Sequence, residues 1–110
     1  MLNKAGSHAF QTFTQEAPEY AAAWREVVGK LDEACALDKK TQKLAYLAVL
    51  AAVRLDSGIP FHVKQAKENG ATRDEIISAV LIGLPATGNA VLASLPIALA
   101  AYDESGTNQL

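Results

Sequence analysis

The apolar positions of this chain fall into blocks with helical spacing. Residues 17–31, APEYAAAWREVVGKL, place Pro18 and Glu19 at the start and Lys30 near the end, an arrangement typical of a helix. Before this block, residues 8–15 predict a short separate helix that docks Phe10 and Phe13. The large side chains of residues 17–31 recur at helical spacing and are expected to form one buried stripe, consisting of Tyr20, Trp24, Val27, Val28 and Leu31.

A further helix is predicted after a connection over residues 31–40. Asp38 is suited to cap its first turn, because a short acidic side chain can accept a hydrogen bond from a free backbone amide. Every residue from 44 to 53, LAYLAVLAAV, is apolar, and a helix that is apolar on all sides is expected to be buried on all sides. One short chain can hardly surround such a helix, so this block predicts that subunits pack together.

The segment RLDSG, residues 54–58, interrupts the apolar pattern. Pro60 is suited to start the next helix, which is expected to run to Asn69 and to stop at Gly70. The residues TRDE, 72–75, have the form of a capping box and predict another helix start. The apolar face of the helix between these signals is expected to consist of Ile59, Val63 and Ala66.

Residues 76–102 carry no charged side chain, and a stretch of this length could span a membrane. Gly83, Pro85 and Pro96 interrupt the run, however, and no basic cluster flanks it to set an orientation. The pattern therefore favours two helices that meet near residues 83–89 inside a helical core, and no membrane partner is predicted.

Composition and charge narrow the class of protein. With 110 residues, half of them apolar and 6% aromatic, the chain fits one domain over residues 1–110 with a modest core, which again favours oligomers. Residues 1–8 are expected to be frayed. The net charge of −2 and the absence of a basic cluster argue against nucleic-acid binding. The single cysteine, Cys35, and the lack of a signal peptide fit a cytoplasmic protein.

Candidate chemistry centres on His62, which is expected at the edge of an apolar helix face. Partial burial there would depress its pKa, and the ring is either a general acid/base facing a cavity or a packed structural histidine. The only other histidine, His8, lies near the expected frayed end, so no metal site is predicted. Cys35 lies beside acidic residues and is expected to be inert.

Three further polar side chains have two open interpretations. Lys43 and Tyr46 either project into a pocket or are a solvated lysine and a core tyrosine. Asn89, in the segment Thr87–Gly88–Asn89, either supplies a polar group to a cavity or belongs to a plain helix junction.

The residues LDKKT (37–41), LAVLAA (47–52) and the spacing of His62 from GAT (70–72) and from Glu75 and Ile76 resemble the carboxymuconolactone decarboxylase and alkylhydroperoxidase D-like superfamily. With PEYAAAWREVV ahead of them, the resemblance covers roughly residues 17–103. It implies an all-α helical bundle that assembles into trimers or hexamers.

The peroxidase branch of that superfamily uses a glutamate, a CxxC pair and a histidine. In this chain the two cysteine positions fall on Leu55 and Gly58, the glutamate position falls on Lys43, and only His62 remains. Peroxide reduction by a disulfide cycle needs one thiol to attack and another to resolve. Thiol peroxidase activity is therefore not expected.

The decarboxylase branch lacks the cysteine pair and fits better. It implies a cofactor-independent lyase acting on a small carboxylate or lactone, in which His62 moves the proton and Lys43 binds the substrate carboxylate. Tyr46 and Asn89 would orient the substrate. The alternative is a non-catalytic oligomeric binding or scaffold protein on the same fold, in which His62 is structural.

Overall fold

The computed structural model of the chain describes residues 8–107, all of whose regular elements are helical. The first two helices form a hairpin, called the arm here, which consists of α1 (His8–Glu16) and α2 (Pro18–Ala34). The remaining elements form the body: α3 (Lys39–Ala52), the 3₁₀ turn η2 (Asp56–Gly58), α4 (Ile59–Glu68), α5 (Arg73–Leu81), α6 (Leu84–Thr87), the 3₁₀ helix η3 (Gly88–Ala93) and α7 (Ser94–Thr107). The expected all-α class and the short helix before α2 are confirmed. Residues 1–7 of the segment expected to be frayed lie outside the described residues.

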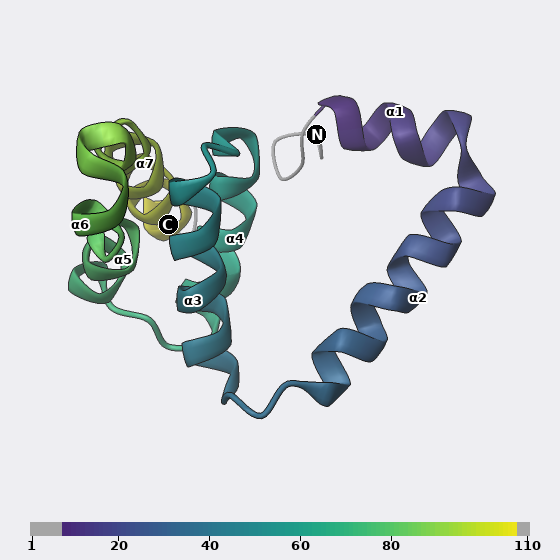
Figure 1. Cartoon of the computed structure of the whole chain (residues 1–110), viewed down its shortest axis with the longest axis horizontal. Helices are drawn as coiled ribbons and strands as arrows, with labels where there is room; N and C mark the ends of the chain where they lie inside the picture. Colours follow the sequence, from purple (N-terminus) through teal and green to yellow (C-terminus); the bar gives the residue numbers. More distant parts are fainter. Residues whose placement is uncertain (1–7, 108–110) are drawn as a thin grey trace.

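The core lies in the body, where α4 packs on α7 and α3, and α5 packs on α3 and α7 (Figure 1). Ile59, Val63 and Ala66 are fully buried, which confirms the predicted inner face of α4. The other largest buried side chains come from each of the neighbouring elements and include Leu47, Ile76, Val80 and Val91. His62 therefore lies on a helix whose opposite side is fixed in the core.

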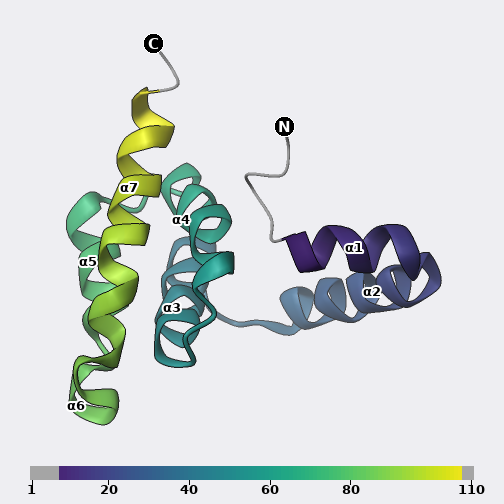
Figure 2. The same cartoon turned by 90° about the horizontal axis from the view of Figure 1, so that it is seen from above.

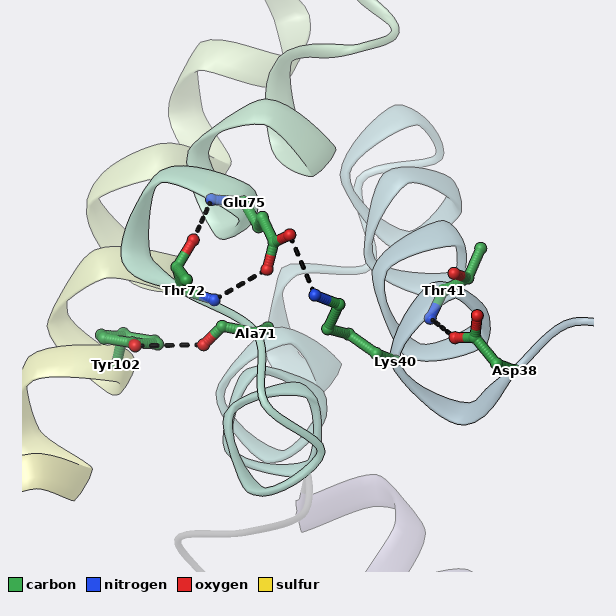
Figure 3. A network of polar contacts seen from close by, with 7 residues as sticks. All are labelled: Asp38, Lys40, Thr41, Ala71, Thr72, Glu75 and Tyr102. Carbon is green, nitrogen blue, oxygen red and sulfur yellow. Dashed lines mark hydrogen bonds and ion pairs between the residues drawn. The ribbon is translucent and has the colours of Figure 1, made fainter.

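Local capping chemistry starts and stops the body helices as predicted. Asp38 accepts a hydrogen bond from the Thr41 backbone amide at 2.8 Å and caps α3. Gly70 follows α4 with a φ of 95°, a left-handed conformation that glycine adopts without steric cost. Thr72 and Glu75 form the predicted capping box of α5, and Glu75 also binds Lys40 of α3 at 3.1 Å (Figure 3).

We expect Thr72→Ala to lower the free energy of unfolding by about 1 kcal/mol, because the backbone amide of Glu75 loses its side-chain acceptor. Chemical denaturation of the purified variant measures this change. Thr72→Ser is the matched control, since it keeps the hydroxyl. An equal loss in both variants would assign the effect to packing and not to the cap.

The arm differs from the prediction. In Figures 1 and 2 it stands to one side of the body and joins it through residues 35–38. Ala21 is the only buried residue of α2, and Tyr20 and Leu31 are 75% and 65% exposed. The expected buried stripe is therefore wrong for a single chain: within the described residues the side chains of the stripe lie at helical spacing, but each is about half exposed or more, and they are Tyr20, Trp24, Val27, Val28 and Leu31.

The apolar helix α3 is also less buried than expected. Leu47, Leu50 and Ala51 face the core, whereas Tyr46 and Val49 are about half exposed. The reason is that α4 and α5 cover only one side of α3, and the arm does not fold down on the other. The body thus has an apolar outer surface next to His62.

The stretch Arg73–Glu104 is long and apolar enough, by composition, to cross a membrane. In the structure it is divided into α5, α6, η3 and α7, which fold back on one another near residues 83–93 (Figure 2). This matches the prediction of helices meeting near residues 83–89. The compact packing of these helices against α3 and α4 favours a soluble protein.

Candidate active site

A cleft of about 950 Å³ lies between the arm and the body, and His62 forms part of its wall. The arm contributes Phe10, Trp24 and Arg25 to the lining. The body contributes side chains of α3, of α4 and of the turn between them, and these include Tyr46, Leu50, Leu55, Ser57 and Phe61. The cleft is therefore mostly apolar, with a few polar groups from both sides.

His62 lies in the second turn of α4, between two aromatic rings. The centroid of its ring is 4.7 Å from that of Tyr46 and 5.1 Å from that of Phe61. Burial lowers the pKa of His62, and the positive charge of Lys43 lowers it further. Within residues 8–107 the ring nitrogens have no hydrogen-bond partner. The His62 ring is thus held in the wall of the cleft with no described side chain bonded to its nitrogens.

The turn before α4 is fixed by an unusual helix end. Arg54 has a φ of 63°, a conformation that costs a non-glycine residue free energy. The backbone amides of Arg54 and Leu55 donate to the carbonyls of Ala51 and Leu50, which is the Schellman arrangement. The Arg54 side chain then binds Asp56, whose other oxygen accepts a hydrogen bond from the buried Ser94 hydroxyl at 2.7 Å.

The contact between Asp56 and Ser94 links the turn that precedes α4, the helix that carries His62, to the start of α7. Both Arg54 and Ser94 donate to the Asp56 carboxylate, and they lower its pKa. We expect Asp56→Ala to cost about 1–3 kcal/mol of unfolding free energy, because the Ser94 hydroxyl is left buried without an acceptor. Denaturant unfolding of Asp56→Ala, Ser94→Ala and the double variant measures their coupling. Additive losses would show that the contact does not stabilise the turn.

A single carboxylate connects the arm to the body across residues 35–38. Asp32, near the end of α2, accepts hydrogen bonds from Lys39 at 3.0 Å and from Gln42 at 2.6 Å. These contacts lower the pKa of Asp32. These contacts join the last turn of α2 to the first turn of α3, on either side of the connection.

The structure places two of the four predicted site residues, His62 and Tyr46, in the lining of the cleft. Lys43 is close enough to His62 to lower its pKa, but it is not among the lining residues. Asn89 lies apart from them, exposed in η3 and outside the cleft lining, so its predicted substrate contact has no counterpart in a single chain.

Sequence reasoning missed the residues that the arm and the turn contribute, namely Trp24, Arg25 and Ser57. Trp24 was assigned to a buried stripe, and Arg25 follows it directly on α2. The position of Phe61 next to His62 in the chain was the one signal available for the lining of the body.

Cys35 is a free, partly buried cysteine in the connection between arm and body. It is not among the residues that line the cleft. In the part of the chain that the structure describes, no three His, Cys, Asp or Glu side chains gather in a way that could hold a metal ion.

The sequence profile of the carboxymuconolactone decarboxylase family matches residues 18–100, which is most of the chain. The chain belongs to this family. A carboxymuconolactone decarboxylase family protein from Legionella pneumophila, solved in its apo form, superposes with a TM-score of 0.75 over 87% of this chain and 86% of its own, at 27% sequence identity. The expected fold and superfamily are therefore confirmed.

A curated relative of this carboxymuconolactone decarboxylase family chain comes from Paracoccus denitrificans and is described as uncharacterized protein 4 in the cox locus. It is 36% identical over 69 residues, which is 63% of this chain and 62% of the relative. The match thus spans less than two thirds of the length of that protein.

Family membership gives a meaning to two residues of the cleft wall. Leu55 and Gly58, the positions at which the resemblance places the cysteine pair of the peroxidase branch, both line the cleft beside His62. Cys35 is the only cysteine of the chain and lies outside the lining. Disulfide cycling needs two thiols, and in this carboxymuconolactone decarboxylase family member neither of the two positions beside His62 carries one.

Proposed function

We propose that this protein is a cofactor-independent lyase that acts on a carboxylate or lactone bound in the cleft, with His62 as the acid/base. The observation that carries the proposal is the setting of His62: a partly buried ring with a lowered pKa in the wall of a cleft, next to Tyr46 and Ser57. Convergence of a titratable ring and further polar side chains on one cavity is what acid/base catalysis requires.

The reaction type proposed is decarboxylation with proton return. The substrate is bound as its carboxylate, and the carbon–carbon bond to that group breaks as carbon dioxide leaves. The conjugated carbonyl of the lactone accepts the electron pair, and the His62 ring, after taking up a proton from the solvent, donates that proton to carbon. Lys43 offsets the developing negative charge, and Tyr46 orients the substrate.

Self-association is part of the proposal, in the form of a trimer or hexamer. Its support is the part of the α2 stripe that does not line the cleft, Tyr20, Val27 and Leu31, since a monomer rarely leaves neighbouring large apolar side chains in water. The alternative function, a non-catalytic oligomeric binding protein, rests on the same stripe and differs in giving His62 no chemical role. The proposed setting is the cytoplasm, where Cys35 would stay reduced.

Proton NMR titration of His62 tests the proposal, with His62→Gln to assign the signal and with small carboxylic acids and lactones added in turn. We expect the ring to titrate with a pKa below its ordinary value of about 6.5 and to respond to one class of ligand. Lys43→Met is the control and should raise the pKa, because it removes a nearby positive charge. A ring that never titrates and ignores every ligand contradicts an acid/base role.

A further inference from the structure

The lining of the cleft combines apolar side chains with one positive charge, and this combination indicates a particular class of ligand. Four of its lining residues are aromatic: Phe10, Trp24, Tyr46 and Phe61. Arg25 is the one charged residue that lines it, and the described part of the chain contributes no aspartate or glutamate to the wall. An apolar lining with one cation suits a ligand that has an apolar body and a single negative group.

The positive charge that lines the cleft comes from the arm, and a second positive charge lies near His62 on the body. Arg25 reaches it from α2 and has no ion-pair partner within residues 8–107. Lys43 is near His62 on the body and raises the local positive potential enough to lower the pKa of that ring. The whole chain has a net charge of −2, so the attraction of an anion is a local property of this cleft.

The size of the cleft indicates how large the apolar part is. Its volume of about 950 Å³ lies near the upper end of the usual range for small-molecule sites, roughly 300–1,000 Å³. An acid of two or three carbons would leave most of the aromatic wall in contact with water. A body of two or more fused rings fits within this volume and can contact several of the aromatic lining residues at once.

We propose that the ligand of this cleft is a monocarboxylate with a bulky aromatic or polycyclic body, bound with its carboxylate at Arg25. The body lies against the four aromatic residues, and the carboxylate is next to His62. This inference rests on the proposed function in that both use the same cleft, and it narrows the class of substrate.

Trp24 provides a direct measurement, because it is the only tryptophan of the chain and lines the cleft. Its fluorescence is titrated with acetate, benzoate and 2-naphthoate, and with 2-naphthamide as the uncharged counterpart. We expect 2-naphthoate to bind at least about tenfold more tightly than benzoate, since a further fused ring is removed from water. We expect 2-naphthamide to bind at least about tenfold more weakly than 2-naphthoate.

Two charge variants of α2 assign the carboxylate contact. Arg25→Gln should weaken 2-naphthoate binding and leave 2-naphthamide binding unchanged. Lys30→Gln is the matched control: it removes the same charge from the same helix, but Lys30 pairs with Glu26 and does not line the cleft. Equal weakening by both variants would overturn a specific contact with Arg25.

The outcomes separate this inference from the proposed function. Selective binding of 2-naphthoate supports the inference even if no lactone is ever turned over, a result that would remove only the lyase proposal. Turnover of a small lactone without selective binding of 2-naphthoate would overturn the inference and leave the lyase proposal intact. If the Trp24 emission changes with protein concentration and no acid affects it, a second copy fills the cleft and the inference is wrong.

Discussion

Replacement of His62 by glutamine is expected to lower the turnover of any responsive carboxylate or lactone by about 10²–10⁴-fold, the usual contribution of a general acid/base. Glutamine keeps a polar group of similar reach but cannot take up and return a proton near neutral pH. The fold should persist, because the inner face of α4 is held by Ile59, Val63 and Ala66. We expect a stability loss of about 1 kcal/mol from the lost ring contacts with Tyr46 and Phe61.

The pH dependence of stability gives an independent check on the His62 ring. Its pKa is lower in the folded chain than in the unfolded one, so below a pH of about 6.5 the unfolded chain takes up the proton first. The stabilising contribution of the neutral His62 ring is therefore complete above that pH. It is lost as the pH falls through the lower pKa that the ring has in the folded chain. The His62→Gln variant should lack this step in urea unfolding between about pH 7.5 and about pH 5.5.

Steady-state kinetics of the wild type and of His62→Gln, over the same pH range, complete this test. The kcat/KM of the wild type should fall on the alkaline side with an apparent pKa below about 6.5, because only the protonated ring can donate to carbon. Activity of the variant at the wild-type level would rule out the acid/base role. Equal pH dependence of unfolding in both proteins would instead show that His62 does not titrate between these states.

The second large effect is expected at the exposed stripe of α2. The double substitution Tyr20→Glu and Leu31→Glu should convert the proposed assembly into monomers, because both side chains are well exposed in a single chain and are expected to be buried between chains. Burying two large apolar side chains contributes roughly 3–6 kcal/mol, which corresponds to an association about 10²–10⁴-fold tighter.

Size-exclusion chromatography with light scattering measures the mass of wild type and variant. Lys30→Glu is the control: it reverses the charge of another exposed α2 residue, and one that lies on the polar side of the helix. It should leave the mass unchanged. A wild-type protein that is already monomeric at tens of micromolar would contradict the self-association proposal, and the stripe would then need another partner.

The sequence predicted the helices of the body and their ends better than it predicted which elements cover the apolar helix faces. Asp38, Gly70 and the pair Thr72 and Glu75 act through bonds to the nearest backbone groups, so their residue types alone locate helix ends. The inner face of α4 follows from periodicity in the same way. The exposure of Tyr20 does not, because periodicity identifies an apolar face but not the element that covers it.

The sequence predicted only those features of the candidate site that depend on residues close together in the chain. His62 was expected at the edge of an apolar face with a depressed pKa, and the structure places it there. Arg25 and Trp24 were missed because their position near His62 depends on the connection over residues 35–38, whose geometry no spacing rule gives. The polar side chain of Asn89 in a helix junction predicts a substrate contact. In the structure Asn89 lies in η3 and is not among the residues that line the cleft.

The contacts of Asp32 with α3 lie near one end of the long helix α2, so a small rotation at that end displaces the other end of the helix further. The helix α2 has 17 residues, and at 1.5 Å per residue it is about 25 Å long, so a rotation of about 5° at that end moves the other end by about 2 Å. A rotation at the end of α2 that carries Asp32 therefore displaces Trp24 and the start of the helix by a larger amount than the residues next to the connection. The separation of the two walls of the cleft is thus sensitive to small changes of angle at the end of α2.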